Sequence, residues 1–113
     1  MEMTDPDLLE TTTREEVAAR VAAIVEEDSD VSLVEAQVRF DRHDEGRRGR
    51  SLVRCELRVR TDDERLAETG EEYGADGALD EALDTLERTL LDRKRERSDE
   101  EYRGRLLEKL NEL

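Results

Sequence analysis

The chain has 113 residues and a net charge of −14, with 46 % charged and 3 % aromatic residues, so it has room for one domain with a core of Leu, Val, Ile and Ala. One Cys and one His exclude an internal disulfide and a tetrahedral zinc site built from these residue types. No apolar run reaches the roughly 18 residues of a membrane helix, and residues 1–9 carry three acids and no basic residue, unlike a signal peptide, so we expect a cytoplasmic protein without a membrane partner.

The N-terminal part of the chain predicts a short strand followed by a helix. Leu8, Leu9 and the threonines after them are expected to form an edge strand, which Pro6 interrupts. Thr13 and Glu16 fit the S/T-x-x-E capping box, in which each side chain satisfies a backbone donor at the start of a helix. The helix should end near residues 28–30, and its apolar stripe is formed by Val17, Ala18, Val21, Ile24 and Val25.

Two segments of alternating apolar and polar residues predict an antiparallel hairpin. The apolar side of the first is formed by Val34, Ala36, Val38 and Phe40. The apolar side of the second is formed by Val53, Cys55, Leu57 and Val59. A polar loop over residues 41–50, which contains two glycines, is expected to join them. Leu66 and Ala67 are expected at the centre of a third antiparallel strand.

A long amphipathic helix is predicted from Ala78 to about Arg97, with a stripe formed by Leu79, Ala82, Leu83, Leu86 and Leu90. Ser98 and Glu101 fit a second capping box, which predicts an extra C-terminal helix. We therefore expect a domain over residues 1–97 and an amphipathic tail over 98–113. The fold class is α+β in the order β-α-β-β-β-α, with two helices packed on one face of a mostly antiparallel sheet.

Positive charge is concentrated in two places in this acidic chain: residues 39–60, with eight arginines and four acids, and the end of the long helix. The candidate nucleic-acid-binding residues are Arg39, Arg42, Arg47, Arg48, Arg50, Arg54, Arg58, Arg60, Arg88, Arg93, Lys94, Arg95 and Arg97. Guanidinium groups bind phosphate oxygens bidentately, and the lack of interleaved aromatic residues favours structured RNA over stacked single strands. In the alternative interpretation, the strand arginines pair with glutamates across the sheet and the helical ones stabilise the helix C-terminus.

Three features resemble the ribosome hibernation-promoting factor family, also called ribosome-associated inhibitors, over residues 8–97. The stretch from Leu86 to Lys94 resembles the closing helix of that family, with Leu-x-Arg-x-Leu followed by basic residues. The strands Val34–Phe40 and Leu52–Arg60 stand in the place of its central hairpin, and Thr13 resembles the Thr that opens its first helix. The resemblance implies a factor without enzymatic activity, cofactor or small-molecule substrate. Such a factor binds structured rRNA of the small ribosomal subunit and inhibits translation by steric occupancy.

The alternative function is an acidic protein–protein interaction module. Its candidate partner-binding residues are Tyr102, Leu106, Leu110 and Leu113, whose spacing suits a short helix–helix seam, including a homodimer contact. The acidic surface has a second explanation, since 33 acids with only two lysines are typical of proteins from a high-salt cytoplasm. Enzymatic chemistry has little support, because His43 is expected in a polar loop and Cys55 alternates with core residues.

Overall fold

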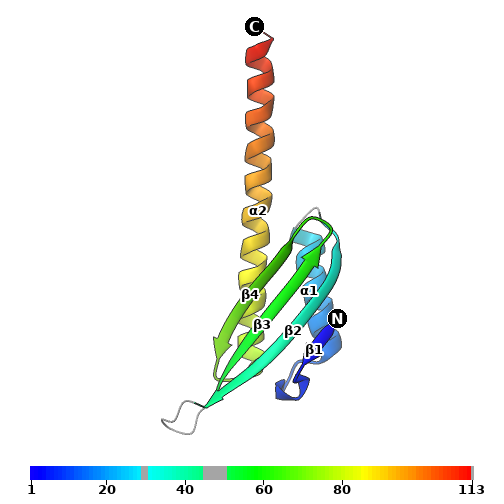
Figure 1. Ribbon diagram of the computed structural model, residues 1–113, viewed down its shortest axis with the longest axis vertical. Coiled ribbons are helices and arrows are strands. Elements are labelled where there is room, and N and C mark those ends of the chain that lie inside the picture. The colour runs from blue at the N-terminus through cyan, green and yellow to red at the C-terminus, as the bar shows by residue number, and fades with distance from the viewer. Residues whose placement is uncertain (29–30, 45–50, 113) are drawn as a thin grey trace.

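The structure is a computed structural model that describes residues 1–28, 31–44 and 51–112. Its elements are β1 (Glu2–Thr4), the 3-10 helix η1 (Pro6–Leu8), α1 (Arg14–Asp28), β2 (Leu33–Asp44), β3 (Ser51–Thr61), β4 (Arg65–Glu72) and α2 (Ala75–Asn111). The strands form one sheet in the order β1-β2-β3-β4, in which β1 is parallel to β2 and the other pairs are antiparallel. Both α-helices cover the same face of this sheet (Figure 1), which confirms the expected α+β fold.

The start of the chain differs from the expected edge strand at Leu8 and Leu9. The first strand is β1, and Leu8 lies in the 3-10 turn that follows it. Asp5 has a left-handed backbone (φ 57°) that turns the chain away from β1, and the fixed φ of Pro6 suits the first position of a helical turn. Leu8 and Leu9 instead pack, half-buried, against the core.

The start of α1 agrees with the capping pattern. The backbone N–H of Glu16 donates to Oγ1 of Thr13 at 3.2 Å, which is one of the two hydrogen bonds of a capping box. From this start the helix presents Val17, Val21 and Val25 to the core, and all three are fully buried.

The β2–β3 hairpin buries the predicted apolar side chains with one exception. Val34 was expected inside, but it is 54 % exposed. The register between β2 and β3 shifts between Leu33 and Glu35, and such a bulge moves one side chain out of the alternation. The hairpin is also longer than expected, since residues 41–44 belong to β2 and pair with residues 51–54. Residues 45–50 lie outside the described part of the chain.

The strand β4, expected around Leu66 and Ala67, packs closely against α2. The contact depends on Gly70, which is buried. A Cβ atom at this position would overlap the backbone oxygen of Ala78 and lie 2.7 Å from the backbone nitrogen of Ala82. Only glycine lets the strand approach the helix this closely. The stripe of α2 that faces the sheet is completely buried, as expected.

The helix α2 continues through the predicted boundary at Arg97. It is one helix of 37 residues, so its length is about 55 Å at 1.5 Å per residue. The tail is helical as predicted, but the pattern at Ser98 does not start a new helix because the backbone never leaves the helical conformation there. The C-terminal part of α2 projects far beyond the sheet (Figure 1), which gives the molecule extents of 70 × 29 × 18 Å. Within the described residues, no helix has the length and apolar character needed to cross a membrane.

Candidate nucleic-acid interface

The face of the sheet opposite the helices carries most of the polar side chains of the strands. Register partners form four rows across β2, β3 and β4: Glu35–Arg60–Arg65, Gln37–Arg58–Ala67, Arg39–Glu56–Thr69 and Asp41–Arg54–Glu71. On the far side, Glu2 and Thr4 of β1 pair with Gln37 and Arg39. We call this surface the open face.

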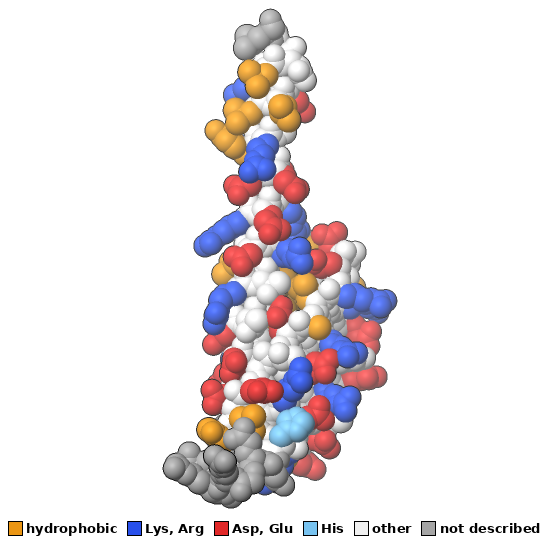
Figure 2. All heavy atoms as spheres, turned by 60° about the vertical axis from the view of Figure 1, so that its left-hand side comes forward, with side chains coloured by type: hydrophobic (Ala, Val, Ile, Leu, Met, Phe, Trp, Pro, Cys, Tyr) orange, Lys and Arg blue, Asp and Glu red, His pale blue; other side chains and the backbone are white. Residues whose placement is uncertain are grey.

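The open face is electrically balanced. Among its described residues, five arginines (Arg39, Arg54, Arg58, Arg60 and Arg65) stand beside five carboxylates (Glu2, Glu35, Asp41, Glu56 and Glu71). The chain as a whole carries −14, so its acid excess lies on other surfaces. The basic character that the sequence shows over residues 39–60 is therefore reduced by acids from β1, β4 and the start of β2. Figure 2 shows the two signs interspersed over the body of the molecule.

Three of these arginines make ion pairs on the open face. Nε of Arg58 lies 2.6 Å from Oε1 of Glu56, and Nη2 of Arg60 lies 3.2 Å from Oε2 of Glu35. The third pair joins Nε of Arg39 to Asp41 at 3.4 Å. The three arginine side chains are 45–65 % exposed, so each pair stabilises the fold by about 1 kcal/mol at most. Pairs this weak orient the guanidinium groups and leave them available to a phosphate.

The other candidate residues of the hairpin are placed differently. Arg42 pairs in register with buried Val53 and alternates with buried Phe40, so it belongs to the helix-covered side of the sheet, at its end. Its side chain is exposed there. The predicted loop residues Arg47, Arg48 and Arg50 lie outside the described residues.

The candidate nucleic-acid-binding residues of α2 divide into two groups. Arg93 and Arg97 approach Glu64 and Asp63 in the β3–β4 turn, at 3.7 and 3.8 Å, and join the helix to the sheet. The others, Arg88, Lys94 and Arg95, are exposed. Arg88 and Arg95 are seven positions apart and lie on the side of the helix away from its buried stripe. Arg88 and Arg95 therefore point away from the open face. One flat surface cannot contact these two residues and the open face at the same time.

Arg65 was not among the predicted binding residues. This residue lies in a stretch, residues 61–87, that contains eleven acids and only this one arginine, so it was assigned to an acidic region. In the structure it stands on the open face, directly opposite Arg60. The usable signal was the alternation in β4: buried Leu66 requires Arg65 and Ala67 to point to the other side of the sheet.

The tail of α2 presents apolar side chains that the described part of the domain leaves exposed. Tyr102, Leu106, Leu107 and Leu110 are 43–65 % exposed, and Figure 2 shows hydrophobic side chains gathered near the end of the projecting helix. At about 100° per residue, Leu106 and Leu110 lie about 160° and 200° around the axis from buried Leu90. The tail stripe thus faces away from the sheet. Leu107 was not among the predicted contact residues, and Leu113 lies outside the described part of the chain.

The Cys55 thiol and the His43 imidazole are the two remaining side chains to consider for catalysis or metal binding. Burial, with a smaller effect from the neighbouring Glu56 carboxylate, raises the pKa of the Cys55 thiol to about 12, so the thiol stays protonated and packs as an apolar group. His43 is exposed near the end of β2. Within the described ranges, no three His, Cys, Asp or Glu side chains come together in a way that could hold a metal ion.

The fold and the open face together define a class of protein: a small α+β domain whose sheet presents exposed arginines. Comparison with protein families matches residues 1–109 to the family described as the C-terminal domain of hibernation factor Hib. The chain belongs to this family, which agrees with the resemblance to ribosome hibernation factors and supports a general role of that kind. No curated protein matched the chain.

Proposed function

We propose that the protein acts in ribosome hibernation by binding structured rRNA of the small subunit through the open face. The observation that supports this most is the row arrangement, which exposes five guanidinium groups on a face that no helix covers. Family membership supports the general role, and a ribosomal partner would place the protein in the cytoplasm.

The proposed mechanism is steric occupancy without turnover. Phosphate oxygens of folded RNA would replace Asp41 and Glu56 as partners of Arg39 and Arg58 and would also bind Arg54, because a guanidinium fork binds phosphate bidentately. The open face carries no Phe, Tyr or Trp among its described residues, which suits recognition of backbone shape better than base stacking. The bound domain would then obstruct the surface that translation needs. No cofactor or small-molecule substrate enters this mechanism.

The remaining candidate residues belong to the proposal on weaker grounds. Arg47, Arg48 and Arg50 are assigned from sequence alone. Arg42 is assigned from its place at the end of the sheet. Arg88 and Arg95 would contact a second RNA segment, because they lie on the side of α2 away from the sheet, and Lys94 is assigned from its exposure alone. Arg93 and Arg97 already pair with the β3–β4 turn, so their main role is structural.

The test compares two double variants with the same change in charge. Arg39→Gln with Arg54→Gln removes two guanidinium groups from the open face, and Arg103→Gln with Arg105→Gln removes two from the tail. Co-sedimentation with purified small subunits should weaken about 10-fold or more in the first case and little in the second. Thermal melts of both variants control for folding. Equal subunit binding by the two variants would show that the open face is not the contact.

A second candidate interaction is favoured by the exposed tail stripe. We propose that a second copy of the chain covers it, through a short helix–helix seam at Tyr102, Leu106 and Leu110. The seam is flanked by charges of both signs, including Arg103, Arg105, Glu101 and Glu108, so two copies can meet there without strong repulsion. Leu106→Glu should abolish any dimer seen by analytical ultracentrifugation. A monomer at all concentrations in the unmodified protein would reject this contact and leave a different partner protein as the occupant.

A further inference from the structure

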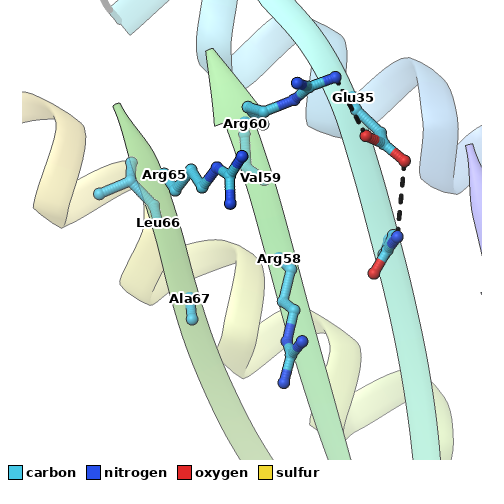
Figure 3. A pocket seen from close by; sticks show the side chains of 8 residues that line it. Glu35, Arg58, Val59, Arg60, Arg65, Leu66 and Ala67 are labelled. Carbon is cyan, nitrogen blue, oxygen red and sulfur yellow. Dashed lines mark hydrogen bonds and ion pairs between the residues drawn. The ribbon is translucent and has the colours of Figure 1, made fainter. Parts of the chain in front are cut away.

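One end of the open face is hollowed. The cavity has a volume of about 350 Å³ and is lined mainly by β3 and β4, with Glu35 and Gln37 of β2 at its side. Figure 3 shows the Arg65 side chain extending from β4 across the sheet toward β3, between Arg58 and Arg60. Arg58 and Arg60 line the same space, but their guanidinium groups point away from Arg65, toward Glu56 and Glu35, so Arg65 is the arginine that extends over the hollow.

The hollow exists because Ala67 has a small side chain, whereas Arg58 and Arg65 beside it have long ones. Ala67 is the register partner of Arg58 and occupies the position on β4 next to Arg65 on the same face. Its methyl group leaves the space beside Arg58 unfilled, whereas a longer residue would occupy it. Below Ala67 the sheet is closed by the backbone of β3 and β4 near Val59 and Leu66, whose side chains point into the core.

The charges around the hollow are not balanced locally. Arg60 and Arg65 are direct register partners, and like charges placed opposite each other on a sheet repel. Arg60 pairs with Glu35 and Arg58 with Glu56, but Arg65 makes no ion pair within 4.0 Å among the described residues. In Figure 3 the Arg60 side chain points toward Glu35, away from Arg65. The row therefore retains one excess positive charge at the mouth of the hollow.

We propose that this hollow is a phosphate-binding subsite, in which Arg65 holds a phosphodiester group of the bound RNA, Arg58 turns from Glu56 to join it and Arg60 supports them from the rim. The inference rests on the proposed function and adds to it a specific contact and a residue, Arg65. A phosphate here would offset the repulsion between Arg60 and Arg65 and would accept several guanidinium donors at once. In the two rows outside the hollow, Arg39 and Arg54 each stand opposite a carboxylate, so the end with the hollow is where an added anion gains most.

The test uses a 12-base-pair RNA duplex and, separately, inorganic phosphate as probes, with binding followed by NMR of the arginine side chains. Arg65→Gln should weaken duplex binding about 3- to 10-fold and reduce the slope of log affinity against log salt by about one. Arg65→Lys keeps the charge but loses the forked guanidinium. Its affinity for the duplex should therefore lie between those of the unmodified protein and Arg65→Gln. Arg105→Gln is the matched control: it removes an exposed, ion-paired arginine far from the hollow. A perturbation of Arg65 by the duplex but not by millimolar phosphate would assign the site to an RNA backbone; the reverse would assign it to free phosphate.

A second variant separates binding from folding. Ala67→Glu places a carboxylate in the hollow, where it can pair with Arg58 or Arg65. We expect the melting temperature to be unchanged or higher, while duplex binding falls at least as far as in Arg65→Gln. If Arg65→Gln and Ala67→Glu both bind the duplex as Arg105→Gln does, the subsite is rejected, and the Arg39/Arg54 comparison on small subunits still decides the proposed function. If the duplex binds through Arg65 but small subunits do not bind, the subsite stands and the ribosomal role fails.

Discussion

At the scale of single residues, two contacts of α2 determine how the chain is assembled. Gly70 allows β4 to approach α2, and the Asp76 carboxylate in the first turn of α2 accepts hydrogen bonds from residues 10–12, more than 60 positions earlier in the chain. Neither role can be recognised in the sequence, where Gly70 is one of six glycines and Asp76 one of 33 acids. Both roles lead to measurable predictions.

Gly70→Ala should destabilise the fold by about 3 kcal/mol, because the added methyl group collides with the backbone of α2 and cannot be relieved by a rotamer change. Urea unfolding followed by circular dichroism measures the change. Gly104→Ala is the control: a Cβ there meets no atom within 4 Å, and replacing a helical glycine should raise the helix content of the tail. Similar stability of Gly70→Ala and the unmodified protein would contradict the close contact.

Asp76→Asn should loosen the segment before α1. The Asp76 carboxylate accepts the backbone N–H of Glu10 at 2.8 Å and that of Thr12 at 3.0 Å. Partial burial opposes its ionisation, but the hydrogen bonds from residues 10–12 outweigh that effect and lower the pKa of Asp76 to about 2. The folded pKa is below the unfolded value of 3.8, so the stabilisation is present above pH 3.8 and is lost as the pH falls through 2.

The measurement is the unfolding free energy of both proteins across this pH range. Near neutral pH the unmodified protein should be more stable than Asp76→Asn by about 1–2 kcal/mol, after allowance for solvent screening. The difference should shrink below pH 4 and be nearly absent at pH 2. A difference that does not depend on pH would show that the contact acts through shape alone.

At the scale of elements, α2 serves two purposes along one uninterrupted helix. Its buried residues extend from Ala75 to Leu90 and hold the helix to the sheet, while every described residue from 98 onward is exposed. The apolar stripe changes sides between these halves. The apolar stripe of the second half therefore does not belong to the core, and it is the surface on which the proposed contact with a second copy rests.

Truncation after Arg97 should therefore leave the domain folded. The melting temperature should fall by only a few degrees, since none of the deleted residues that the structure describes is buried and the ion pairs of Arg93 and Arg97 remain. Binding to small subunits should persist, and self-association through the tail should disappear. Thermal melts, co-sedimentation and analytical ultracentrifugation give the three results. Loss of the folded state on truncation would mean that the tail stabilises the domain directly.

At the scale of the whole molecule, the dominant quantity is the net charge of −14. The open face is balanced, so the excess acids lie on α1, on α2 and in the turns. In dilute buffer these acids repel one another and repel RNA, whereas at 1 M salt the Debye length is only about 3 Å. A salt-adapted surface would explain this composition, and it makes a prediction that differs from that for an ordinary basic RNA-binding domain.

The melting temperature should rise from 0.05 M to about 2 M KCl as the repulsion is screened. Subunit binding should persist at salt concentrations that dissociate a conventional basic domain, because salt weakens the arginine–phosphate contacts but also removes the long-range repulsion by the acids. Paired thermal melts and co-sedimentation across the series test both statements. A flat or falling melting temperature would reject the salt-adapted interpretation.

The sequence alone determined the class of fold, the hairpin and both helix stripes, because periods of two and of 3.6 residues are local properties of the chain. It missed the place of β1, the exposure of Val34 and the continuity of α2, since a turn, a bulge and an unbroken helix depend on small local differences that periodicity does not encode. The character of the candidate site was decided only by the tertiary structure. Segment 39–60 is basic by itself, but strand pairing brings Glu2, Glu35 and Glu71 beside it and places Arg65, from an acidic stretch, opposite Arg60. Charge on a surface is the sum over residues that are neighbours in space, and in a sheet those neighbours come from distant parts of the chain.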